Sequence, residues 1–191
     1  LPPDDPQALA RLGVARGRFL VNGVYVMDRT GTVVAHETPG VRSTGINLAF
    51  RPYFQQAIEG VHSVHAAIGS NSQERGLYYA APLYEGDTPS SAIIGVVMFK
   101  VGFELFDEVL RRAGMPIVLL SPQGVVFSSS QPEWLFAVAP PLTQARIDAI
   151  RASRQFGKHF DSGVASALPF SPDAREVELQ GVTYAVDRHR V

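Results

Sequence analysis

One strand–turn–strand pattern occurs twice in this chain and limits the folds that it can adopt. Residues 24–37, VYVMDRTGTVVAHE, and residues 117–129, IVLLSPQGVVFSS, each hold an apolar run, a four-residue turn ending in glycine, and a second run rich in β-branched residues. Antiparallel hairpins separated by helices are typical of an α+β fold. The repetition favours two stacked subdomains of similar plan, and one larger α+β sheet remains the alternative.

Helices and further strands surround these two hairpins. Residues 52–59 are framed by Pro52 and Gly60, which are typical of the first position of a helix and of the position just past its end. Residues 92–101 have apolar side chains on both faces and predict the central strand of a sheet. The other predicted elements are helices at 6–18, 103–112 and 143–154, strands at 61–68 and 76–84, and a hairpin formed by 176–179 and 183–187.

The composition excludes several classes of protein. The 191 residues carry a net charge of −1, so we expect no polybasic surface for nucleic acid. The chain has no cysteine, which rules out a disulfide scaffold, a zinc–thiolate site and a cysteine nucleophile. Its longest apolar run, residues 92–99, is far shorter than the ~20 residues that a membrane-spanning helix needs.

Residues 50–54, FRPYF, contain the first candidate binding residues. Arg51 lies at the predicted start of a helix, and an arginine beside free N–H groups is suited to a carboxylate or a phosphate. Tyr53 can add a hydroxyl donor. In the alternative interpretation, Arg51 pairs with a structural acid and Tyr53 belongs to the core.

The second and third candidates lie in a loop and at the end of a strand. Residues 69–76, GSNSQERG, place small hydrogen-bond donors and one arginine between two strands. The candidate binding residues here are Ser70, Asn71, Ser72 and Arg75. A plain solvated turn explains the same pattern and remains the alternative. Lys100 ends a predicted buried strand and lies on the same face as Val96 and Met98. A lysine on such a core-facing row needs an anion nearby, unless its ammonium group reaches solvent at the sheet edge. If Arg51, Arg75 and Lys100 converge, they face a single acid, Glu74, and the pocket is cationic.

Signatures of enzymes are weak. The chain has no G-x-S-x-G motif, no phosphate-binding Walker loop and no H-E-x-x-H motif. His62 and His65 have the spacing of metal ligands, but on a strand they point to opposite faces. We therefore expect no metal, no cofactor and no catalysis. A small serine hydrolase built from His159, Asp161 and a serine remains an alternative, as does a ligand-free dimerisation module.

Several stretches of the chain resemble one family. The periplasmic sensor domains of four-carbon-dicarboxylate sensor histidine kinases are similar in order and spacing from about Val24 to the end. The stretches are NLAFRPYFQQAIEG (47–60), AIGSNSQERGLYYAAPL (67–83), GVVMFKVGFELF (95–106), GVVFSSSQPEWLF (124–136) and ASRQF (152–156). The family has a double Cache (PDC-type) fold, in which two PAS-like antiparallel-sheet subdomains follow a long N-terminal helix.

This resemblance implies a division of the chain into three segments. Residues 1–22 would be an N-terminal helix or linker, shortened here. Residues 23–113 would form the membrane-distal, ligand-binding subdomain, and residues 114–191 the membrane-proximal one.

The resemblance also implies a ligand and its site. The matching pocket residues are Arg51, Tyr53, Ser70, Asn71, Ser72 and Lys100. Amino-acid-binding relatives of the fold carry R-x-W-Y and a later aspartate, whereas this chain has Arg51-Pro52-Tyr53-Phe54 and a lysine on the last distal strand. A lysine repels an α-ammonium group and favours a second carboxylate, so we expect a small organic acid such as a dicarboxylate.

The remaining implications concern the parent protein. We expect the periplasmic, extracytoplasmic part of a homodimeric inner-membrane receptor, with membrane anchors outside this chain. A sensor histidine kinase is the expected parent, and a diguanylate cyclase or a chemoreceptor with another small ligand is the alternative.

Overall fold

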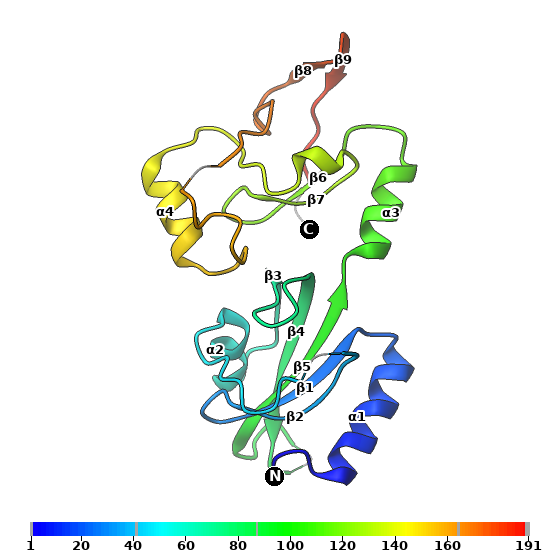
Figure 1. Cartoon of the computed structure of the whole chain (residues 1–191), viewed down its shortest axis with the longest axis vertical. Helices are drawn as coiled ribbons and strands as arrows, with labels where there is room; N and C mark the ends of the chain where they lie inside the picture. Colours follow the sequence, from blue (N-terminus) through cyan, green and yellow to red (C-terminus); the bar gives the residue numbers. More distant parts are fainter. Residues whose placement is uncertain (1, 41, 87, 164, 190–191) are drawn as a thin grey trace. The chain divides into compact units, whose positions relative to one another are not determined.

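A computed structural model describes residues 2–40, 42–86, 88–163 and 165–189. The chain forms two compact units, Leu1–Phe103 and Glu104–Val191, each with its own sheet and helices (Figure 1). Within the described residues, no helix is long and apolar enough to cross a membrane.

A five-stranded antiparallel sheet is the centre of the first unit. Its strand order is β2-β1-β5-β4-β3. The bounds are β1 (Gly23–Asp28), β2 (Val33–Glu37), β3 (Ser63–Ile68), β4 (Arg75–Tyr84) and β5 (Ile93–Gly102). The central position of β5 agrees with the prediction from its apolar sequence, because both faces of a central strand are covered.

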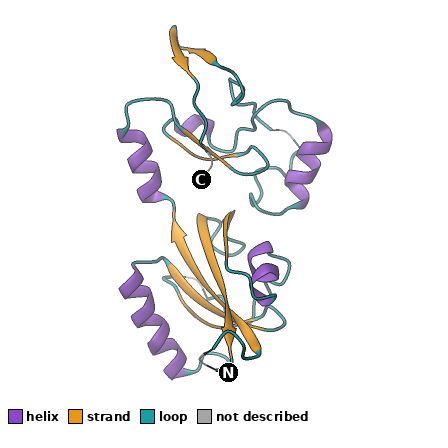
Figure 2. Ribbon diagram, turned by 180° about the vertical axis from the view of Figure 1, so that it is seen from behind, coloured by secondary structure: helices purple, strands orange, loops and turns teal. Residues whose placement is uncertain are grey.

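The side chains of β5 alternate between two separate cores. Val96 and Met98 point to one face, where they pack with residues of α2 (Pro52–Ile58) and of the neighbouring strands. Val97 and Phe99 point to the other face, where they contact the cluster around α1 (Pro6–Phe19). The two helices accordingly lie on opposite faces of the sheet (Figure 2).

Local sequence explains where α1 begins and ends. The Asp5 carboxylate accepts a hydrogen bond from the backbone N–H of Ala8 at 2.9 Å, and Pro6 occupies the first helical position. Leu20 ends the helix in the left-handed conformation. Leu12 is the residue of α1 that is buried, and it packs against Val24 of β1.

The second unit has shorter elements. They are α3 (Glu104–Arg112), β6 (Val118–Leu120), β7 (Val126–Ser129), a 3-10 helix (Pro132–Trp134), α4 (Gln144–Ala152), β8 (Glu176–Leu179) and β9 (Val182–Ala185). The strands form two separate antiparallel pairs, β6-β7 and β8-β9. Val126, Ala137, Ala139 and Leu168 form a buried core that Trp134 and Phe170 cover.

The predicted helices and strands are all present, with ends that shift by one or two residues. The α+β class is confirmed. The chain divides into two compact units. The first unit ends at Phe103, so α3 groups with the second unit, whereas the sequence places residues 103–112 at the end of the first. The assignment of the units as membrane-distal and membrane-proximal stays a prediction.

Candidate ligand-binding site

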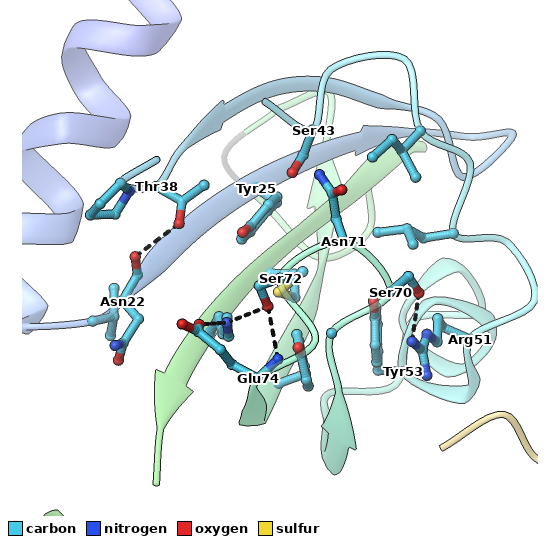
Figure 3. A pocket seen from close by; sticks show the side chains of 18 of the residues that line it. Asn22, Tyr25, Thr38, Ser43, Arg51, Tyr53, Ser70, Asn71, Ser72 and Glu74 are labelled. Atoms are coloured by element: carbon cyan, nitrogen blue, oxygen red, sulfur yellow. Dashed lines mark hydrogen bonds and ion pairs between the residues drawn. The ribbon is translucent and has the colours of Figure 1, made fainter. Parts of the chain in front are cut away.

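A cavity of about 420 Å³ lies in the first unit, on the face of the sheet that α2 covers (Figure 3). Its walls come from the end of α1, from β1, β4 and β5, from the start of α2, and from the loops at 38–48 and 69–74. Its polar and charged lining residues are Arg16, Asn22, Tyr25, Thr38, Ser43, Arg51, Tyr53, Ser70, Asn71, Ser72, Glu74, Tyr78 and Lys100. Six of the seven residues predicted from the sequence are in this set.

Arg51 lies at one wall of the cavity and is 4% exposed. It precedes Pro52 at the start of α2, and its guanidinium reaches the loop after β3. There it donates to the backbone carbonyl of Ile68 at 2.9 Å and to Ser70 Oγ at 2.6 Å. These contacts aim a buried cation and a hydroxyl at the same part of the cavity.

Lys100 provides a second buried cation. Its side chain is 5% exposed, and Nζ lies 2.9 Å from Ser72 Oγ and 2.9 Å from Glu74 Oε2. Gly76 leaves room for the lysine stem, because a Cβ at that position would lie 3.2 Å from both Cγ and Cε of Lys100. A buried ammonium group requires such partners, since an unpaired charge is costly in the interior.

Two tyrosines form the wall between these cations. The rings of Tyr53 and Tyr78 are stacked with centroids 5.3 Å apart. Burial raises the pKa of Tyr53 to about 12, against the opposite effect of the nearby Arg51 cation, and burial likewise raises the pKa of Tyr78. Both hydroxyls therefore stay protonated donors at neutral pH. The Tyr78 hydroxyl is buried and has no hydrogen-bond partner among the described residues.

The loops over the cavity are linked by hydrogen bonds. The backbone N–H of Ser43 donates to His36 Nε2 at 3.1 Å, and His36 Nδ1 lies 3.0 Å from Thr44 Oγ1. Asn71 Nδ2 donates to the carbonyl of Arg42 at 2.9 Å, so it joins the two loops. These bonds hold Ser43 and Asn71 at the cavity (Figure 3).

Arg75 requires a correction, because its side chain is not part of the cavity lining. The sequence placed Arg75 in a loop, but the structure makes it the first residue of β4. Strand alternation puts it on the face opposite to Gly76 and Tyr78. Its guanidinium lies over the ring of Phe103, 5.5 Å from the centroid.

Sequence reasoning missed Arg16, Tyr25 and Tyr78. Tyr78 pairs with Lys100 in the β4–β5 register, so strand parity could have placed both on one face. Arg16 comes from α1, and only the tertiary fold brings it to the cavity. With Arg16 in place of Arg75, the lining residues that the structure describes still include three cations and one acid, Glu74.

Outside this cavity, the described residues offer fewer groups that could bind a ligand or a metal. Within the described residues, no three His, Cys, Asp or Glu side chains gather as a metal site. His159 stacks on Phe136 with centroids 3.7 Å apart, and burial lowers its pKa. A second cavity of about 270 Å³, in the second unit, has two acids and one arginine in its lining, Glu104, Asp107 and Arg111.

Comparisons with known proteins agree with this geometry. No family model matches the chain. It is 31% identical over 157 residues to the C4-dicarboxylate transport sensor protein DctB of Pseudomonas aeruginosa, covering 79% of this chain and 25% of that protein. The DctB protein of Rhizobium meliloti is 31% identical over 136 residues, with 70% of this chain and 21% of that protein covered. The chain thus spans about a quarter of the length of these relatives.

Solved structures extend the likeness to the fold. The sensor domain of the Vibrio cholerae histidine kinase DctB matches with a TM-score of 0.76 and 28% identity, over 96% of this chain and 68% of that one. The ligand-binding domain of the Pseudomonas aeruginosa chemoreceptor PctC, solved with GABA, matches with a TM-score of 0.56 and 16% identity, over 73% and 66%. At 16% identity the second match supports the fold alone. By sequence and by fold, this chain is a DctB-like sensor domain, a ligand-binding module and not an enzyme.

Proposed function

We propose that this domain is the extracytoplasmic sensor of a membrane-anchored histidine kinase, and that it binds a small dicarboxylate in the cavity of the first unit. The observation that carries the proposal is the pair of buried cations, Arg51 and Lys100, in one cavity. Each has a serine hydroxyl beside it, Ser70 and Ser72 respectively. A ligand with two carboxylates can pair with both cations.

The charge of the cavity favours a dicarboxylate over an amino acid. An α-ammonium group needs a free carboxylate or several acceptors. Among the described residues, the lining has one carboxylate, Glu74, and it is paired with Lys100. Lys100 repels an ammonium group and attracts a carboxylate. The amino-acid-binding chemoreceptor domains share the fold at 16% identity, so they support neither an amino-acid ligand nor a chemoreceptor parent here.

The path from the cavity to the rest of the receptor begins at α1. Arg16 and Leu20, at the end of this helix, belong to the cavity lining. A ligand that binds better to one position of α1 than to another shifts the balance between two states of a homodimeric receptor. Ligand-bound and ligand-free crystals with the same α1 and the same dimer contact would overturn this part of the proposal.

A thermal-shift screen tests the ligand and the site together. Purified domain is heated with four-carbon dicarboxylates, monocarboxylates and amino acids, alongside Arg51→Ala. At ~100-fold over Kd, a ligand stabilises by about 2.7 kcal/mol, and each kcal/mol raises Tm by about 2–4 °C at this size. We expect a dicarboxylate to raise Tm by several degrees and Arg51→Ala to abolish the shift.

Arg75→Ala is the matched control, because it removes an arginine that is near in sequence but outside the cavity. It should retain the dicarboxylate shift. An amino acid that stabilises the domain while no carboxylic acid does so would refute the proposed ligand class.

A further inference from the structure

We propose that Glu74 is an internal competitor of the ligand: its carboxylate occupies the anion position at Lys100 in the empty cavity and is displaced by one carboxylate of the ligand. This inference rests on the proposed dicarboxylate site. It assigns to Glu74 a role in setting affinity and in discriminating between ligands with one and with two carboxylates.

The two partners of this ion pair differ in their surroundings. Lys100 has 5% of its side chain exposed, whereas Glu74 has 67% exposed. The lysine therefore belongs to the cavity wall, and the glutamate reaches it from solvent. Tyr78 lies opposite Lys100 in the strand register and Gly76 packs against its stem, so the ammonium group has little freedom to follow Glu74 outward.

The backbone of Glu74 is fixed although its side chain is exposed. Its carbonyl accepts a hydrogen bond from the N–H of Gly69 at 2.9 Å, which closes the loop. Gly69 has no space for a side chain, since a Cβ would lie 2.5 Å from Ser72 Oγ and 2.9 Å from Tyr78 Oη. Displacement thus requires rotation of the Glu74 side chain alone, and the loop that holds Ser70 and Ser72 stays in place.

Energetics explain why such a competitor is useful. A buried ammonium group without a partner destabilises the empty domain, and Glu74 supplies a carboxylate for it. A ligand carboxylate makes the same charge-assisted hydrogen bonds to Lys100. Binding then exchanges one carboxylate for another, and the released Glu74 returns to water, where it is well solvated.

The exchange affects ligands differently. A monocarboxylate pairs with Arg51 and Ser70 and leaves the Glu74–Lys100 pair intact. A dicarboxylate must displace Glu74 to reach Lys100. Removal of the Glu74 charge should therefore strengthen dicarboxylate binding and leave monocarboxylate binding nearly unchanged.

Isothermal titration calorimetry of the domain at fixed salt tests this inference. The probes are succinate and butyrate, which have the same carbon number and differ by one carboxylate. Glu74→Gln is compared with the unchanged domain and with Glu59→Gln, which removes an exposed glutamate at the C-cap of α2, outside the cavity lining. We expect Glu74→Gln to tighten succinate binding by roughly two- to fivefold, the effect of an exposed ion pair, and Glu59→Gln to leave it unchanged.

The outcomes separate this inference from the proposed function. Succinate binding that Arg51→Ala abolishes but that Glu74→Gln leaves unchanged or weakens would overturn the role of Glu74 alone. An equal gain in affinity for succinate and butyrate would also overturn it, because the loss of a negative charge near the cavity would then favour every anion alike. Absence of succinate binding to every variant would overturn the dicarboxylate site itself. Glu74→Ala provides a second variant, which should behave like Glu74→Gln.

Discussion

The Tyr78 hydroxyl is buried in the cavity wall and lacks a partner among the described residues. A buried donor without a partner costs about 1–3 kcal/mol. Tyr78→Phe should therefore leave the empty domain equally stable or more stable, and should weaken ligand binding because the ligand loses a donor. Urea unfolding and calorimetry measure the two effects.

The control for this variant is Tyr79→Phe, whose ring lies on the other face of β4 and is 42% exposed. It should change neither property. A Tyr78→Phe domain that is clearly destabilised in the absence of ligand would show that the hydroxyl has a structural partner.

Tyr53 gives the domain a predictable response to alkaline pH. Its pKa is raised to about 12 in the folded state, chiefly by burial, against about 10 for an unburied tyrosine. Between these pH values the unfolded chain releases the Tyr53 proton and the folded chain keeps it. The contribution of Tyr53 to the free energy of unfolding is therefore fully present below pH 10 and falls as the pH rises. The loss is roughly 1 kcal/mol by pH 11.

Tyr53→Phe removes this titration, so its stability should fall less steeply from pH 9 to 11 in chemical unfolding experiments. Tyr84→Phe is a control outside the cavity lining. Identical pH slopes for the unchanged domain and Tyr53→Phe would contradict the burial of an un-ionised hydroxyl at this position.

Individual site residues were predictable where the local sequence pattern determined the face of the sheet toward which the side chain points. Lys100 is an example, because strand alternation with Val96 and Met98 places it on the cavity face. Arg75 was predicted to lie in the loop, but it is the first residue of β4. Strand alternation therefore places it on the face of the strand opposite to Tyr78, which lines the cavity. Arg16 could not be found from sequence, because α1 and the cavity meet only in the folded unit.

At the scale of elements, His36 of β2 connects the sheet to the loop over the cavity. It accepts from Ser43 N–H and lies within hydrogen-bond distance of Thr44 Oγ1, which in turn donates to Asp4 Oδ1 at 2.6 Å. His36→Ala removes the acceptor for Ser43, so the loop at 42–46 should exchange amide hydrogens faster and ligand affinity should fall.

Hydrogen–deuterium exchange of the loop and calorimetry measure the two consequences. His62→Ala serves as the control, because His62 is exposed and lies outside the cavity lining. Unchanged exchange at Ser43 and Thr44 in His36→Ala would show that the loop is held by other contacts.

Elements themselves were well predicted because their boundaries have strong local signals. Pro52 and Gly60 frame α2, and the turn at Asp28–Gly31 joins β1 to β2. In this turn Asp28 Oδ1 accepts hydrogen bonds from the backbone N–H groups of Thr30 and Thr32 at 2.8 and 3.0 Å. Such side-chain-to-backbone bonds are encoded within a few residues, and so they are visible in sequence.

At the scale of the whole molecule, the repeated hairpin predicts two units of similar plan, and the chain divides into two compact units. The repeat did not indicate how large each sheet would be. In the first unit five strands join, whereas in the second the pairs β6-β7 and β8-β9 remain separate sheets. The difference arises from long-range pairing: the described part of the chain between β7 and β8 contributes only isolated bridges, such as Val138 with Val125 and with Ala167.

A crystal structure of the domain with bound succinate would show how its two carboxylates are held. We expect one carboxylate within hydrogen-bond distance of Arg51 and Ser70, and the other within hydrogen-bond distance of Lys100 and Ser72. A ligand bound in the cavity of the second unit, or a first-unit cavity that stays empty while succinate saturates the domain in solution, would contradict the proposed dicarboxylate site.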